Sequence, residues 1–149
     1  MNNFKHLLIV SIAAVVLSSC ATTSLYYWGG TKNDASKYEE MAYQMYKKQS
    51  PEALCAMLCV YEDMVQNPIG TRQVPPPGIC AEYAYYLSMP ETAETFAQTA
   101  TKAQKKMYEH SDYAVFFPEY AKQLFERELS LYPESAIFIQ PLIRKLTQK

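Results

Sequence analysis

The sequence has few of the residues on which catalysis and metal binding most often depend. Its 149 residues include two histidines, four cysteines and four glycines. No glycine-rich phosphate loop is present, and the Cys55 and Cys59 pair lacks the companion ligands of a zinc site. His110-Ser111-Asp112 contains the letters of a catalytic triad, but adjacent residues cannot converge on one another as such a site requires. We therefore expect a protein that is not an enzyme, with no metal site and no cofactor.

An excess of charge of one sign is also lacking. There are 14 basic and 15 acidic residues, which gives a formal net charge of −1, and no block of lysine and arginine occurs. Proteins that bind nucleic acid neutralise phosphates with a basic surface, and polybasic membrane patches need the same residues. The sequence thus predicts no nucleic-acid partner, and no motif indicates a small-molecule substrate.

The chain has no apolar run of the roughly 20 residues that a membrane-spanning helix requires. A shorter run at residues 7–17 follows Lys5 and leads through small residues to Cys20. This order is typical of a secretory signal peptide, here residues 1–19. Leu17-Ser18-Ser19-Cys20 resembles a bacterial lipobox, in which cleavage precedes the cysteine and its sulfur is diacylated. An ordinary signal peptide with a chance cysteine is the alternative.

Lipidation at Cys20, with a diacylglyceryl group and an N-acyl chain, would anchor the protein to a membrane, since two or more acyl chains hold stably. Ala21 follows the cysteine. In lipoproteins of proteobacterial type an Asp at this place favours the inner membrane. The resemblance therefore implies the outer membrane, with the domain facing the periplasm.

Residues 20–30 are expected to form the lipidated N-terminus and a short aromatic tether. Tyr26, Tyr27 and Trp28 lie close to the anchor and are membrane-proximal for that reason. Amphipathic aromatic side chains suit the lipid interface, so these three could dip into it. Alternatively they pack back onto the first helices, with Gly29-Gly30 forming the turn. We favour the packing interpretation.

Beyond this tether, residues 31–149 are predicted to form one all-α domain. Apolar residues recur at helical spacing, and no segment shows the period-two alternation of a strand. Ser50-Pro51 is typical of an N-cap followed by proline at the first helical position. Short connections make neighbouring helices antiparallel. We expect six helices, at residues 34–49, 51–67, 79–88, 91–108, 118–132 and 134–149, with Met107, Phe138, Leu142 and Leu146 facing inward and Pro141 kinking the last.

Three cysteines remain after Cys20. Cys55 and Cys59 are spaced i, i+4 on one helix face, which is awkward for a mutual disulfide. A bridge from either one to Cys80 is geometrically feasible. We favour the simpler interpretation that all three are small buried apolar residues.

One pair of segments follows the tetratricopeptide pattern. Ala121, Phe125 and Pro133 have the spacing of the small residue, the aromatic residue and the proline of the second helix of that repeat. Tyr83, with Ala84 and Leu87, resembles the core of the first helix. The two halves lie too far apart for a normal repeat, so residues 90–115 would be an insertion.

Further patches of sequence suggest a family. The lipobox is followed by Leu25-Tyr26-Tyr27-Trp28-Gly29, then by Val74-Pro75-Pro76-Pro77-Gly78 and by Leu131-Tyr132-Pro133-Glu134-Ser135. Together these resemble the bacterial lipoprotein family catalogued as domain of unknown function 4810, although Thr92–Phe116 is longer than the family's usual turn. The resemblance implies a short tetratricopeptide-like solenoid encoded beside two other lipoproteins, one of them similar to the curli secretion channel.

We therefore expect a periplasm-facing helical adaptor in a complex of envelope lipoproteins. We expect its partner-binding groove to be lined by Tyr83, Tyr86, Tyr120 and Phe125. All four could equally belong to the core. The alternative function is a structural envelope lipoprotein with no dedicated protein ligand and with its Trp28 region in the lipid.

Overall fold

The computed structural model describes residues 24–32 and 35–147, and it confirms the all-α fold class. Within those residues the only strands are β1 (Thr31–Lys32) and β2 (Ala35–Ser36), which pair antiparallel. The helices are α2 (Lys37–Lys48), α3 (Pro51–Gln66), α4 (Ile79–Ser88), α5 (Pro90–Thr99), α6 (Lys102–Lys106), α7 (Tyr113–Leu131) and α8 (Ala136–Thr147), with the 3₁₀ turn η1 (Pro133–Ser135) before the last.

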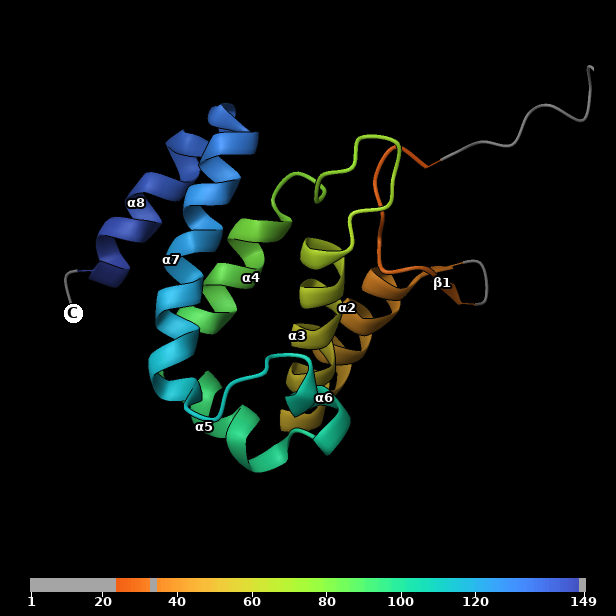
Figure 1. Ribbon diagram of the computed structural model, residues 1–149, viewed down its shortest axis with the longest axis vertical. Coiled ribbons are helices and arrows are strands. Elements are labelled where there is room, and N and C mark those ends of the chain that lie inside the picture. Colours follow the sequence, from red (N-terminus) through yellow and green to blue (C-terminus); the bar gives the residue numbers. More distant parts are fainter. Residues whose placement is uncertain (1–23, 33–34, 148–149) are drawn as a thin grey trace, which may run out of the picture.

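Five helices, α2, α3, α4, α7 and α8, run in alternating directions along the long axis (Figure 1). The shorter α5 and α6 lie across the lower end of this array. The most extensive packing is between α4 and α7, followed by that between α2 and α3. The α2–α3 pair predicted from its short connection is therefore present. Helices α4 and α7, which contain the residues with tetratricopeptide-like spacing, are separated along the chain by α5 and α6.

The tight joint between α2 and α3 forms as the sequence predicts. Gln49 ends α2 in the left-handed conformation (φ 47°), and the Ser50 hydroxyl accepts a hydrogen bond from the N–H of Ala53. Pro51 occupies the first helical position, where its missing N–H costs nothing. At the other end of α2, Ser36 and Glu39 form a reciprocal capping box.

The prediction of a single helix over residues 91–108 is wrong, because the helix is interrupted at Ala100 and Thr101. Ala100 is extended (φ −61°, ψ 137°), and Thr101 starts α6 with a capping box to Gln104. The cap satisfies N–H groups locally and so overrides the helix propensity of the surrounding Ala and Lys residues. As a result Met107, predicted to face inward, is exposed, and Tyr108 is buried in its place.

Helix α7 begins at Tyr113, five residues earlier than predicted. The Asp112 carboxylate accepts from the N–H of Val115 and caps the helix. Pro118 lies within the helix rather than at its start and removes one backbone hydrogen bond. Burial of the Tyr113 and Phe117 side chains in the core offsets that loss.

The predicted inward face of the last helix needs one correction. Phe138 is exposed, and Ile139 is the residue of this helix that is buried. Ile139 lies three and seven residues before Leu142 and Leu146, a spacing that places all three on one helix face. Leu142 and Leu146 do pack against the core as expected, and Pro141 lies within α8, which continues to Thr147.

All three described cysteines are free thiols, so neither disulfide alternative is present. Cys55 and Cys80 are fully buried, as the simpler interpretation predicts, and Cys59 is half-buried. Burial raises the pKa of Cys59 and Cys80 to about 12. Both thiols therefore stay protonated, and unreactive as nucleophiles, at neutral pH.

A carboxylate from a distant helix caps α4. Gly78 precedes this helix with φ 87° and offers no capping side chain, but Glu128 Oε1 of α7 accepts from its N–H at 2.7 Å. The N–H groups of Ala81 and Cys80 also interact favourably with this carboxylate. A negative charge at the positive end of the helix dipole is stabilising, so Glu128 fixes the start of α4 against α7.

We expect Glu128→Ala to lower the free energy of unfolding by about 1–3 kcal/mol, because it leaves the N–H groups at the start of α4 without an acceptor. Urea denaturation measures the change. The matched control is Glu126→Ala, which removes an exposed carboxylate two residues earlier. Equal losses in the two variants would contradict the capping role.

Candidate functional site

A mostly apolar groove lies between α7 and α8 and extends to the end of α4. Its volume is about 310 Å³. Phe125 and Ala121 of α7 form one wall, and Leu146 of α8 forms the other. Lys122 and Glu126, both exposed, place one charge of each sign at its edge. The complete lining is Ser88, Pro118, Ala121, Lys122, Phe125, Glu126, Ile143 and Leu146.

The four aromatic residues predicted to line one groove are not brought together. Phe125 lines the groove just described. Tyr83 is 0% exposed and cannot line an accessible groove, which corrects that prediction. Tyr86 stacks on Tyr61 and lines a separate hollow between α2, α3 and α4. Tyr120 is half-buried and hydrogen-bonded inside the helix array. Of these four only Phe125 lines the groove between α7 and α8, and 4% of its surface is exposed.

The buried tyrosines surround a carboxylate that the sequence interpretation did not single out. Tyr83 Oη and Tyr120 Oη each lie 3.0 Å from Oε2 of Glu62 in α3. Gln66 Nε2 donates to Glu62 Oε1 at 3.1 Å and to Tyr120 Oη at 2.9 Å. Tyr108 Oη lies 2.8 Å from Tyr83 Oη. We call these five residues the Glu62 network; it links α3, α4, α7 and the segment that follows α6.

Burial raises the pKa of the Glu62 carboxyl, and hydrogen bonds from Tyr83, Tyr120 and Gln66 oppose that shift. Tyr83 is fully buried and Tyr108 nearly so, and the donors and acceptors of the network bond to one another. Its geometry therefore suits a structural connection between helices. The only sequence signal for it was a glutamate placed between Tyr61 and Met64 inside the apolar stripe of α3.

Because the pKa of Glu62 is raised in the folded state, the free energy of unfolding should depend on pH. In the folded state Glu62 binds its proton more tightly than in the unfolded chain, so its contribution to stability decreases as the pH rises through the raised pKa. We expect Glu62→Gln to gain stability relative to the wild type between about pH 4.5 and pH 7. Urea denaturation at a series of pH values measures this difference. A difference that is constant with pH would contradict the assignment.

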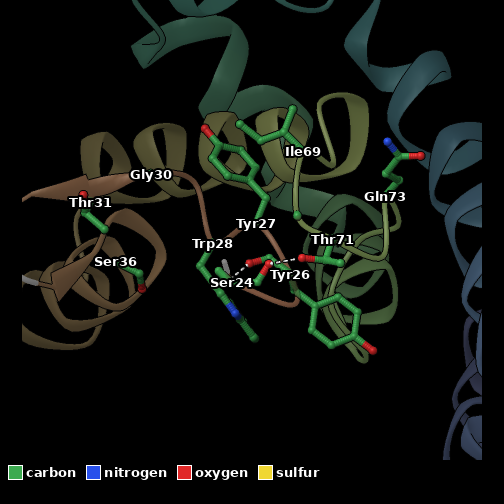
Figure 2. Close-up of a pocket in the computed structure, with 11 residues that line it drawn as sticks. Ser24, Tyr26, Tyr27, Trp28, Gly30, Thr31, Ser36, Ile69, Thr71 and Gln73 are labelled. Carbon is green, nitrogen blue, oxygen red and sulfur yellow. Dashed lines mark hydrogen bonds between the residues drawn. The ribbon is translucent and has the colours of Figure 1, made fainter. Parts of the chain in front are cut away.

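The aromatic segment before β1 packs onto the helices. We call residues 24–30 the N-terminal strap. The N–H groups of Thr71 and Arg72 donate to the carbonyls of Ser24 and Leu25, each at 3.1 Å. Figure 2 shows Ser24 and Tyr26 beside Thr71. They lie along the rim of a hollow of about 580 Å³ between the strap and the loop at residues 67–78, which joins α3 to α4. The folded domain thus starts at least as early as Ser24, ahead of the predicted boundary at residue 31.

Each aromatic residue of the strap has a partner in the domain. Tyr27 Oη donates to Asp63 Oδ2 at 2.8 Å. The Trp28 ring lies 5.4 Å from that of Tyr38, and its carbonyl accepts from the Tyr38 N–H. Arg72 Nη1 donates to Tyr26 Oη at 2.9 Å. The packing interpretation therefore describes Tyr26, Tyr27 and Trp28, whereas Cys20 lies outside the described residues.

The strap approaches the loop so closely that only glycine fits at position 70. A Cβ on Gly70 would lie 2.6 Å from two backbone atoms of Tyr26 and 2.8 Å from the Leu25 carbonyl oxygen. Gly29 and Gly30, with φ of 77° and 83°, then turn the strap towards β1. The strap and the loop are therefore joined through their backbones.

We expect Gly70→Ala to displace the strap and to lower the free energy of unfolding by about 1–3 kcal/mol, the usual cost of overpacking. The emission of Trp28, the single tryptophan, should shift to longer wavelength as its ring leaves Tyr38. Ile69→Ala, at the exposed neighbouring position, is the control and should leave the emission unchanged. An unchanged spectrum in Gly70→Ala would contradict this packing.

Residues with potential chemical function are scattered over the remaining surface. The His110 ring stacks on Phe116, with centroids 3.8 Å apart. Among the residues that the structure describes, no group of three or more His, Cys, Asp or Glu side chains is arranged to hold a metal ion. None of the helices described is both long enough and apolar enough to cross a membrane.

Comparison with protein families, with curated proteins and with solved structures gave no match.

Proposed function

We propose that this protein is an outer-membrane lipoprotein, anchored through lipid on Cys20, that acts as a periplasm-facing helical adaptor for another envelope lipoprotein. The proposal combines the lipobox resemblance of Leu17-Ser18-Ser19-Cys20 with the apolar groove between α7 and α8. It includes membership of the domain of unknown function 4810 family, and with it the tetratricopeptide-like interpretation of α4 and α7. A lipoprotein similar to the curli secretion channel is the partner that this family resemblance favours.

The observation that carries the proposal is the position of the groove relative to the strap. The strap lies at the upper end of the helix array in Figure 1. The groove is lined by Ser88 at the end of α4, by α7 residues from Pro118 to Glu126 and by Leu146 near the end of α8. In Figure 1, α7 and α8 lie on the opposite side of the array from the strap. An anchor near the strap therefore leaves the groove on the side of the array away from the anchored segment, where a second protein has access to it.

The lining of the groove indicates the chemistry of the partner. Ile143 and Leu146, both half-buried, offer apolar surface beside the buried Phe125 and Ala121, which suits the apolar face of a helix or an extended segment. Glu126 at the edge would pair with a cation that flanks that apolar face, whereas Lys122 already forms an ion pair with Glu119 at 2.6 Å. The rival function, a structural lipoprotein with Trp28 in the lipid, is disfavoured by the packing of Trp28 on Tyr38.

Crosslinking in intact cell envelopes followed by affinity purification tests the adaptor function. We expect a specific envelope lipoprotein in the wild-type sample and a loss of at least about tenfold for Leu146→Asp, since a charge in an apolar contact must be desolvated. Met107→Asp is the matched control, because it places the same charge on an exposed apolar residue outside the groove.

A second control is Cys20→Ala, which removes the proposed anchor and should reduce capture from the membrane fraction. Leu146→Asp and Met107→Asp must both leave the thermal unfolding temperature unchanged for their partner recoveries to be compared. Recovery of no lipoprotein above the Cys20→Ala background, or equal recovery with Leu146→Asp and Met107→Asp, would contradict the adaptor function at this groove.

A further inference from the structure

Strongly exposed apolar side chains gather at the end of the molecule that carries the strap. Leu25 of the strap is 54% exposed, and Ile69 of the following loop is 75% exposed. Ile137 and Phe138, in the first turn of α8, are 74% and 79% exposed. The strap, the loop at residues 67–78 and the start of α8 all lie at the upper end in Figure 1. Apolar side chains of this size normally pack inside a domain. Their exposure at the same end of the molecule therefore indicates a surface that contacts another molecule or a membrane.

These segments are held together as one surface. Tyr132, just before η1, donates from Oη to the carbonyl of Pro75 in the loop at 2.6 Å. The Tyr132 phenol also interacts with Tyr26 of the strap. The backbone hydrogen bonds from Thr71 and Arg72 then join the strap to the same loop. The exposed apolar residues thus belong to parts of the fold that are connected to one another.

The distance to the proposed anchor decides what covers this surface. Cys20 precedes Ser24 by four residues, and four residues span at most about 14 Å. Because the strap is fixed to the loop from Ser24 onward, lipid chains on Cys20 would hold this end of the domain close to the bilayer. No such constraint applies to the groove between α7 and α8.

We infer that Leu25, Ile69, Ile137 and Phe138 form a membrane-contact surface whose partner is the headgroup and upper acyl region of the bilayer. The inference deepens the proposed function and rests on the lipid anchor at Cys20. It differs from the prediction for Trp28, which packs on Tyr38 while its neighbours contact the lipid. The contact sets the orientation of the bundle, with the α7–α8 groove pointing into the periplasm.

The charges at this surface define the type of contact. Arg72 lies over the Tyr26 ring, 5.9 Å from its centroid, and Glu134 acts on the same tyrosine. With one cation and one anion beside Tyr26, attraction to the bilayer comes from the apolar side chains rather than from charge. The contact should therefore form equally well on zwitterionic and anionic membranes.

Quenching of tryptophan by brominated lipid tests this surface. The lipidated full-length protein, with Trp28→Phe as a common background, is reconstituted into phosphatidylcholine vesicles that carry bromine on the acyl chains. We expect the emission of Ile69→Trp to fall at least about twofold, because lipid acyl chains would then cover that side chain. Phe138→Trp is a second probe of the same surface, useful if the loop variant folds poorly.

Val115→Trp is the matched control, since Val115 is 65% exposed and lies in the first turn of α7 at the opposite end. Its emission should stay unquenched. Vesicle flotation of the same samples reports the anchor separately. Protein that floats with Ile69→Trp and Phe138→Trp unquenched would overturn the membrane-contact surface alone. Protein that does not float would overturn the lipid anchor, and the surface with it.

Discussion

The structure depends on a carboxylate placed among tyrosines inside the helix array. Glu62 carries charge that burial disfavours, and its two oxygens accept from Tyr83, Tyr120 and Gln66 at about 3 Å. A partly satisfied buried carboxylate would be costly, so α3, α4 and α7 must keep the positions that supply these donors. The network also reaches Tyr108, which holds the α5–α6 region against the same helices. Burial of polar groups thus defines the arrangement of an otherwise apolar core.

The helix array that this network holds together has two surfaces of different character, one around the strap and one between α7 and α8. At one end the strap is joined to the loop around Gly70 through backbone hydrogen bonds, and exposed apolar side chains lie beside it. On the opposite side of the array, the groove between α7 and α8 is open. A lipid anchor only four residues ahead of Ser24 would place the first end at the membrane. The adaptor function that we propose follows from this separation, because a rigid bundle would keep its partner groove away from the bilayer.

Periodicity and caps predicted most of the helices, since Ser50-Pro51 and the stripe of α4 are local signals. The pattern was misleading where a local cap competed with helix propensity, at Thr101, and where burial outweighed a proline, at Pro118. The candidate site was harder to predict because its contacts are distant in sequence: Glu128 caps α4 at Gly78, 50 residues earlier. The high tyrosine content likewise suggested a binding surface, whereas Tyr83 is buried in the core.

The lipid anchor is the central claim, and mass spectrometry of the N-terminal peptide from the membrane-extracted protein tests it most directly. We predict a mature chain that begins at Cys20 and carries a diacylglyceryl group on the sulfur and an acyl chain on the α-amino group. A chain that retains residues 1–19, or one cleaved elsewhere with an unmodified Cys20 thiol, would contradict the account.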